Sequence, residues 1–252
     1  MKIALITGVS KGLGEALAKL FLESGIHVLG ISRNSNGRLV KIATKNNVNY
    51  EHYPCDLSNI SELENVIEKI QEDVNRLNPS LFYLINNAAV IDPIHQVIQI
   101  ENDRLAYHFQ LNVVAPMILM NQMLNYSSSS NTTFIGVNIT SGAAERPVYG
   151  WSAYCSSKAS INMYTKTVAL EQVNLKTAQK IIAFNPGIMD TTMQQTIRSS
   201  SKESFIEIDK FKGYKENKQL RDTDMVAGIL IDILNDEASI ENGKIYDVNE
   251  YF

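Results

Sequence analysis

Short runs of β-branched and aliphatic residues alternate with amphipathic stretches along almost the whole chain. The runs predict strands over Lys2–Thr7, Ile26–Ser32, Val48–Pro54, Leu81–Asn86, Thr132–Thr140, Lys180–Asn185 and Lys244–Asp247. Strands that alternate with helix-length segments are typical of a parallel sheet covered by helices on both faces. We therefore predict one α/β domain over residues 1–252, a doubly wound sheet of seven mainly parallel strands.

The amphipathic stretches predict the helices that would flank this sheet. They lie at Gly12–Ser24, Gly37–Asn46, Ile60–Leu77, Glu101–Tyr126, Ser152–Leu175 and Thr223–Asn235. The polar stretch at about residues 188–221 has no sustained pattern and is predicted to form a mobile cap. The serine run at residues 127–130 predicts a loop before the fifth strand.

Composition excludes several classes of function. The formal net charge is -4 and the 23 lysines and arginines are scattered, which opposes nucleic-acid binding. Two cysteines and four histidines without metal-ligand spacing predict neither a disulfide framework nor a metal site. No apolar run approaches the ~18 residues of a membrane helix, and the first residues enter a strand-like run without a leader pattern. We therefore expect a cytoplasmic protein with no membrane partner.

The stretch TGVSKGLG, Thr7 to Gly14, follows the first predicted strand and opens the first predicted helix. Glycines let the backbone turn sharply there, and a helix N-terminus attracts an anion such as phosphate. The turn therefore predicts a Rossmann-type dinucleotide site. Its spacing, T-G-x-x-x-G-x-G, matches the general fingerprint only loosely, so a purely structural turn is the alternative.

The end of the second predicted strand indicates which dinucleotide would bind. An acidic residue at this point accepts hydrogen bonds from the ribose of NAD, whereas the 2′-phosphate of NADP needs cations. This chain has Ser32-Arg33 there and Lys11 beside the glycine turn. The residues favour NADP(H), and the alternative is that Lys11 and Arg33 are ordinary solvated charges.

Tyr154 and Lys158 lie four residues apart in SAYCSSKAS and would share one face of a helix. A cation about 4 Å from a phenolate at an effective dielectric of ~20 stabilises it by roughly 4 kcal/mol. We therefore expect Lys158 to lower the pKa of Tyr154 toward neutrality, so that the hydroxyl can exchange protons. For the pair alone, surface packing is the alternative.

Two further residues complete a pattern: Ser141 ends the fifth predicted strand in NITSGAA, and Asn112 lies in FQLNVVAP. With them the chain resembles the classical short-chain dehydrogenase/reductase family over essentially its whole length. The motifs that carry the resemblance are TGVSKGLG, Cys55-Asp56-Leu57, Asn86-Asn87-Ala88-Ala89, Asn112, Ser141, the Tyr154 and Lys158 pair, and Asn185-Pro186-Gly187. Ala89 departs from the family's usual glycine, for which we expect a slight adjustment of the loop.

The resemblance implies a role for each motif residue. Tyr154 would be the general acid in ketone reduction, and Lys158 would lower its pKa and hold the nicotinamide ribose. Ser141 would bind the substrate carbonyl, and Asn112 would position a water in a proton relay through Lys158. Together with the cations above, the implied cofactor contacts are Gly8, Ser10, Lys11, Gly12, Leu13, Gly14, Ser32, Arg33, Asp56, Leu57, Asn87, Ala88, Asn112, Tyr154, Lys158, Pro186, Gly187, Ile188 and Thr191.

A narrower resemblance concerns the substrate. PGIMDTTMQQ and GKIYDV resemble the sepiapterin-reductase-like branch, and LNVVAPMILM and YGWSAYCSSKASINMYT are similar to its bacterial benzil reductases. The resemblance implies NADPH-dependent reduction of a bulky or aromatic ketone or a vicinal diketone. Candidate substrate contacts are Ser141, Tyr149, Trp151, Tyr154, Met189, Met193 and Asp247. Asp247 would anchor a pterin-like ring through paired hydrogen bonds, or is simply solvated.

Other functions stay open. They are reduction of another carbonyl, such as a 3-oxoacyl or sugar-derived ketone, a non-catalytic NADP-sensing protein, and a sugar-nucleotide epimerase of the related extended group. The complete set of Asn112, Ser141, Tyr154 and Lys158 opposes the sensing protein, and the short segment after Gly187 opposes the extended group. Relatives commonly associate through the helices that correspond to Glu101–Tyr126 and Ser152–Leu175, so we expect a homodimer or homotetramer.

Overall fold

The computed structural model describes residues 1–130 and 132–252. Over these residues it has one seven-stranded sheet in the order β3-β2-β1-β4-β5-β6-β7, with every neighbouring pair parallel. The strands are β1 Lys2–Thr7, β2 His27–Ser32, β3 Tyr50–Pro54, β4 Leu81–Asn86, β5 Thr133–Ile139, β6 Lys180–Asn185 and β7 Ile245–Asp247. The predicted doubly wound α/β fold is confirmed.

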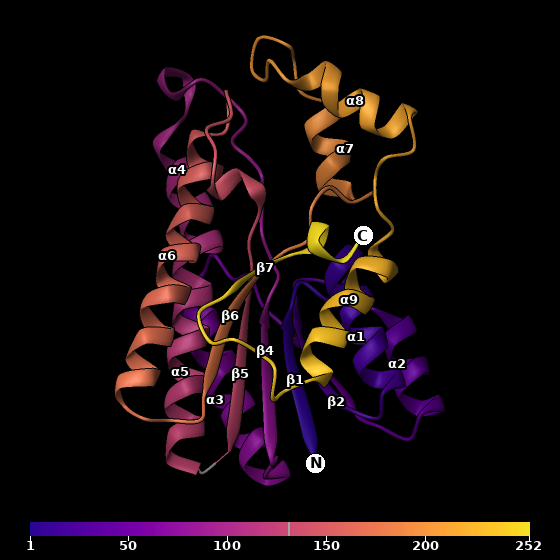
Figure 1. Cartoon of the computed structure of the whole chain (residues 1–252), viewed down its shortest axis with the longest axis vertical. Helices are drawn as coiled ribbons and strands as arrows, with labels where there is room; N and C mark the ends of the chain where they lie inside the picture. Colours follow the sequence, from indigo (N-terminus) through magenta and orange to yellow (C-terminus); the bar gives the residue numbers. More distant parts are fainter. Residues whose placement is uncertain (131) are drawn as a thin grey trace.

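Helices cover both faces of the sheet (Figure 1). One layer comprises α1 Gly12–Glu23, α2 Gly37–Lys45 and α9 Thr223–Asn235, and the other comprises α3 Ile60–Leu77, α5 Ala115–Ser130 and α6 Ser152–Asn174. Successive residues of a strand point to opposite faces, so Ala4 of β1 packs in the first layer and Leu5 in the second. The central strands are buried on both sides, which explains their unbroken apolar runs.

The predicted helix Glu101–Tyr126 is divided into three parts. It consists of α4 Asn102–Phe109, a π-helical turn η2 Gln110–Val114, and α5. Pro116 has no backbone N–H, so the carbonyl of Asn112 four residues earlier has no α-helical donor. The irregular turn contains Asn112, a candidate catalytic residue. Short π-helical turns within α-helices are frequent at functional sites.

The serines at 127–130 belong to the last turn of α5, and the prediction of a loop there is wrong. The hydroxyls of Ser128 and Ser130 donate to the carbonyls of Leu124 and Tyr126, at 2.8 and 2.9 Å. A serine hydroxyl within a helix can donate its hydrogen bond to the backbone carbonyl four residues earlier, so a run of serines does not require a loop.

The segment predicted to form a cap contains two helices, α7 Thr192–Arg198 and α8 Ile208–Glu216. Both lie beyond the carboxyl ends of the strands (Figure 1). Phe205, Ile208 and Phe211 pack with Trp151 in a hydrophobic cluster separate from the two sheet layers. Among the described residues, no helix combines the length and apolar character needed to cross a lipid bilayer.

Candidate active site

A cavity of about 720 Å³ opens at the carboxyl ends of the central strands. The chain runs outward from β1 to β3 and then returns to β4 beside β1, so the loops after β1 and β4 diverge. Ligands of doubly wound sheets bind in the crevice that such a change of direction creates. The cavity is lined by the glycine turn, the loops that follow β2, β4, β5 and β6, and residues of α6, α7 and α8.

The glycines of TGVSKGLG have different roles. Gly8 and Gly12 line the cavity with φ of +76° and +63°, a backbone conformation that side chains rarely adopt. Gly14, predicted as a cofactor contact, does not line the cavity. A Cβ at Gly14 would lie 2.3 Å from the carbonyl oxygen of Gly8, so this glycine lets α1 pack tightly against the turn.

The loop after β2 lies against the glycine turn. The side-chain amide of Asn36 donates to the carbonyl of Ser10 at 3.3 Å, and both predicted cations, Lys11 and Arg33, line the cavity. The Ser32 hydroxyl is occupied, since it donates to the carbonyl of Asn34 at 2.8 Å. The charged side chains of the described lining are four cations, Lys11, Arg33, Arg146 and Lys158, and one carboxylate, Asp56. The excess of positive charge suits a polyanionic ligand.

The other predicted cofactor contacts that line the cavity are Ser10, Leu13, Ser32, Asp56, Leu57, Asn87, Ala88, Tyr154, Lys158, Pro186, Gly187, Ile188 and Thr191. Thr7 connects the turn to the loop after β4. Its hydroxyl accepts from the backbone N–H groups of Asn87 and Ala88, and its carbonyl accepts from the Asn87 amide, each at 2.9 Å. Asn34 and Ser35 also line the cavity and were not singled out from the sequence.

Tyr154 and Lys158 are buried on one face of α6, as their spacing predicts. Lys158 Nζ donates to the carbonyl of Ile139 at 2.8 Å and lies 5.8 Å from the centre of the Tyr154 ring. Burial raises the pKa of Tyr154 to about 12, and the neighbouring Ser141 hydroxyl opposes this increase. Burial also lowers the pKa of Lys158 to about 8.

The expectation that Lys158 brings the pKa of Tyr154 toward neutrality is therefore wrong for this structure. Helical spacing places the two groups on one face, but removal of the phenol from water raises its pKa, and the group that opposes this increase is the Ser141 hydroxyl. A raised pKa keeps Tyr154 protonated at neutral pH, and the protonated phenol is the form that donates a proton.

Asn112 is buried and does not line the cavity with its side chain. Its Oδ1 accepts from the N–H of Val90 at 2.9 Å, and its Nδ2 donates to the carbonyl of Val90 at 2.8 Å. The side chain thus fastens η2 to the loop after β4. The backbone carbonyl of Asn112 has no α-helical donor, because Pro116 carries no N–H.

The predicted substrate residues divide into two groups. Those that line the cavity are Ser141, Trp151, Tyr154, Met189 and Met193. Tyr149 lies outside the lining and is 44% exposed, because Gly150 turns the chain between it and Trp151. Asp247 also lies outside. Its carboxylate accepts from the Asn185 side chain at 2.7 Å and from the Asn249 backbone at 2.8 Å, so it is neither free nor simply solvated.

Trp151, Phe205 and Phe211 form an aromatic wall beside Tyr154, of which the sequence predicted only Trp151. Trp151 stacks on Phe205 with ring centres 4.9 Å apart, and it meets Phe211 and Tyr154 edge to face at 5.4 and 5.5 Å. Trp151 and Phe211 both line the cavity. Two phenylalanines in an otherwise polar segment were the available signal for this wall.

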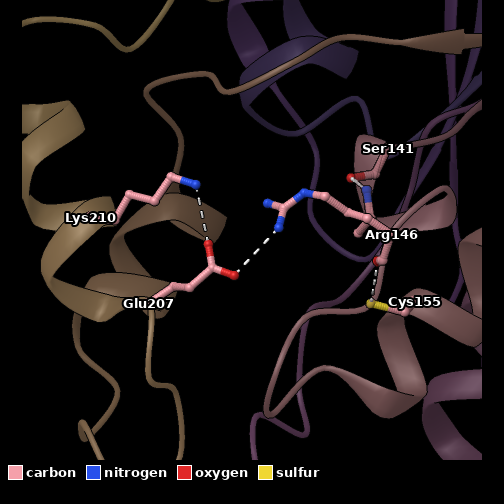
Figure 2. A network of polar contacts seen from close by, with 6 residues as sticks. Ser141, Arg146, Cys155, Glu207 and Lys210 are labelled. Carbon is pink, nitrogen blue, oxygen red and sulfur yellow. Dashed lines mark hydrogen bonds and ion pairs between the residues drawn. The ribbon is translucent and has the colours of Figure 1, made fainter.

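Arg146 and Glu207 form a second connection between the cavity wall and the cap. Arg146 lines the cavity, and its Nη1 lies 3.4 Å from Oε1 of Glu207, which precedes α8 (Figure 2). The other Glu207 oxygen lies 3.4 Å from Nζ of Lys210. No sequence motif marked Arg146, because its importance depends on a partner far along the chain.

Comparison with known proteins agrees with this geometry. A family model described as short chain dehydrogenase matches residues 2–202. The benzil reductase ((S)-benzoin forming) of Bacillus subtilis is 40% identical over 251 residues, covering 100% of both chains. The sepiapterin reductase of Rattus norvegicus is 27% identical over 209 residues, covering 79% of this chain and 78% of that protein.

A crystal structure of a short chain dehydrogenase/reductase from Saccharomyces cerevisiae has a TM-score of 0.83 and 27% identity, covering 99% of this chain and 96% of that chain. Sequence similarity, the topology of the sheet and the side chains around the cavity all indicate the same group of oxidoreductases. The chain belongs to the short chain dehydrogenase family.

Proposed function

We propose that the protein is an NADPH-dependent carbonyl reductase that acts on bulky or aromatic ketones, including vicinal diketones. The observation that carries the proposal is the position of Tyr154. Its protonated hydroxyl, beside Ser141, shares one cavity with the glycine turn and with an aromatic wall. Relatives named benzil reductase over the full length of the chain support this substrate class.

The residues present fit a nicotinamide dinucleotide, and the cations in the lining support its 2′-phosphorylated form. Gly12 lines the cavity, and even a Cβ built there would come no closer than 3.7 Å to a neighbouring side chain, so the turn offers an open cradle for a phosphate. Lys11 and Arg33 would bind the 2′-phosphate, and Lys158 the nicotinamide ribose. When bound, the reduced cofactor supplies the hydride.

The protein's own groups position the ketone and handle the proton. Ser141 would donate a hydrogen bond to the carbonyl oxygen, and Tyr154 would transfer its proton to that oxygen as negative charge develops. Lys158, charged below its pKa of about 8, stabilises the phenolate that remains. Trp151 and Phe211 line the cavity, where they would exclude water and contact aromatic substituents of the substrate.

A pterin anchored by Asp247 is not part of this proposal. Both carboxylate oxygens accept hydrogen bonds from the protein's own Asn185 and Asn249 side chains. Other ketones, such as 3-oxoacyl or sugar-derived ones, have no aromatic group to occupy the wall, so we expect them to react more slowly.

Purified protein should oxidise NADPH in the presence of benzil, followed by loss of nicotinamide absorbance, and should use NADH less efficiently. Tyr154→Phe should lower kcat by at least ~100-fold because it removes the proton donor. NADPH binding, followed by fluorescence, should change less than about twofold, since the ring remains. A variant that keeps the original rate would eliminate Tyr154 as the acid.

We also propose that the protein is cytoplasmic and acts as a homodimer or homotetramer through α6 and the segment from α4 to α5. Met163, Leu170 and Val173 are 65%, 62% and 62% exposed on α6. Their spacing of seven and three residues places them on one side of the helix. An exposed apolar stripe of this kind supports an interface between copies.

A further inference from the structure

We propose that His108 is a positioning residue that holds the π-helical turn bearing Asn112 in register with the helix bearing Tyr154 and Lys158. The kinetic part of this inference rests on the proposed reductase function. The structural part concerns only hydrogen bonds within the chain, so the two can be tested separately.

His108 is fully buried at the end of α4, and its two ring nitrogens have different partners. Nδ1 lies 2.6 Å from the backbone carbonyl oxygen of Asp92, in the loop after β4. Nε2 lies 3.0 Å from Nδ2 of Asn112 and 3.0 Å from Oγ of Ser157. One imidazole therefore contacts η2, α6 and the loop after β4.

These partners determine where the proton of the imidazole resides. A carbonyl can only accept, so Nδ1 carries the hydrogen that points to Asp92. Burial lowers the pKa of His108, the Asp92 carbonyl opposes this and the Lys158 charge reinforces it, so the ring is neutral at neutral pH. Nε2 is then an acceptor, and it receives one hydrogen of the Asn112 amide.

As a result, both N–H groups of the Asn112 side-chain amide have an acceptor. One hydrogen of Nδ2 goes to the Val90 carbonyl and the other to His108, while Oδ1 accepts from the Val90 N–H. The orientation of the amide, and with it the η2 backbone, is held from two sides.

His108 also reaches the helix that bears Tyr154 and Lys158. Ser157, which immediately precedes Lys158, places its Oγ 3.0 Å from Nε2 and 2.9 Å from the carbonyl oxygen of Tyr154, so its one hydroxyl hydrogen lies within reach of both acceptors. The His108 ring meets the Tyr154 ring edge to face with centres 6.2 Å apart. A displacement of η2 relative to α6 would therefore alter the distance between the Asn112 carbonyl and the Tyr154 and Lys158 pair.

The test uses two substitutions of the ring. His108→Phe fills the space but has no acceptor, whereas His108→Gln offers an amide oxygen to Asn112 and an N–H to Asp92. Gln179→Leu is a matched control, because Gln179 is a buried side chain that binds Phe134 and Thr132 at the amino end of β5, away from the cavity.

The first measurement is nuclear magnetic resonance and needs no substrate. In the wild-type protein, the ¹⁵N shifts of the His108 ring should report a protonated Nδ1 and an unprotonated Nε2. Hydrogen exchange of the Asn112 side-chain amide should accelerate at least ~10-fold in His108→Phe and return toward the wild-type rate in His108→Gln. A protonated Nε2, or an Asn112 amide unaffected by His108→Phe, overturns the assignment.

The second measurement is steady-state reduction of an aromatic diketone with NADPH. His108→Phe should lower kcat about 10- to 100-fold with KM for NADPH within about twofold, because misplaced groups slow the reaction step. The Gln variant should recover most of the rate, and Gln179→Leu should keep the wild-type kcat. Loss of thermal stability with unchanged kcat in His108→Phe would assign this histidine a purely structural role.

A double-mutant cycle tests whether His108 acts through Asn112. The combination of His108→Phe with Asn112→Ala should be no slower than Asn112→Ala alone. Multiplied losses would overturn the proposed connection. If the wild-type protein reduces no ketone, the reductase proposal fails, while the resonance measurement still decides the role of His108.

Discussion

Lys158 illustrates how burial sets the chemistry of a single side chain. Its ammonium group is enclosed by the protein and donates to the Ile139 carbonyl, its one hydrogen-bond acceptor among the described residues. The pKa of about 8 means that the folded protein holds this proton less tightly than the unfolded chain, where the ordinary value is 10.5. The charge that the proposed reaction needs therefore lowers the stability of the fold.

Lys158→Met should stabilise the protein while it abolishes turnover. Below pH 8 the folded state contains the full cost of the buried charge, and between pH 8 and 10.5 it progressively loses that charge. At pH 7 the gain should be about 3 kcal/mol, less about 1 kcal/mol for the lost hydrogen bond to Ile139. Denaturant melts should show that the gain shrinks as pH rises through this window. A variant that is less stable than the wild type at pH 7 would contradict the argument.

The proposed preference for NADPH can be tested at Arg33, which lines the cavity. Arg33→Ala should weaken NADPH binding about 10-fold or more, since it removes a charged partner of a phosphate. NADH has no 2′-phosphate, so its binding should change less than about twofold. Dissociation constants for both cofactors measure the difference, and equal losses would assign Arg33 to the solvated surface.

At the level of helices and strands, the glycine turn depends on how closely α1 approaches β1. A Cβ at Gly14 would lie 2.3 Å from the Gly8 carbonyl oxygen and 2.5 Å from Nδ2 of Asn87. Both atoms belong to the region that shapes the cavity. The packing of α1 and the shape of the cavity therefore both depend on Gly14 having no side chain.

Gly14→Ala should cost about 2 kcal/mol or more of folding free energy, because the clash is with backbone. It should also weaken NADPH binding, since relief of the clash displaces the turn. Gly37→Ala is the matched control: this glycine also begins a helix, but an added Cβ meets nothing within 4 Å. Thermal melts and cofactor titrations of the two variants test the claim, which fails if both behave alike.

In the complete fold, the cavity and the exposed face of α6 lie in different places. The loops at the carboxyl ends of the strands bring the candidate site residues together, and the cap adds Phe211 and the Glu207 partner of Arg146. The stripe on α6 is on the side of the helix that the sheet does not cover. A substitution in this stripe can therefore test the proposed assembly without altering the cavity lining.

Leu170→Glu should shift the protein toward the monomer, because a charge would replace an apolar side chain at the proposed interface. Val40→Glu is the control, since Val40 is 53% exposed on α2, outside the proposed interface. Light scattering after size-exclusion chromatography gives the mass of each. An unchanged mass for Leu170→Glu would place the interface elsewhere.

Local patterns in the chain were enough to predict the sheet and most of the motif residues around the cavity. A short, continuous apolar run is typical of a strand buried on both faces, which is why all seven strands were predicted over the described residues. Helical spacing likewise put Tyr154 and Lys158 on one face of α6. These features depend on neighbours a few positions apart, and such neighbours are visible in a sequence.

Tertiary packing decided the rest. The pKa of Tyr154 rises because distant segments bury it. Asp247 lies outside the cavity lining, where Asn185, 62 positions away, donates to its carboxylate. Tyr149 and Trp151 are two residues apart, yet only Trp151 lines the cavity. Burial and hydrogen-bond partners are set by elements that meet only in the folded chain, so spacing along the sequence cannot contain them.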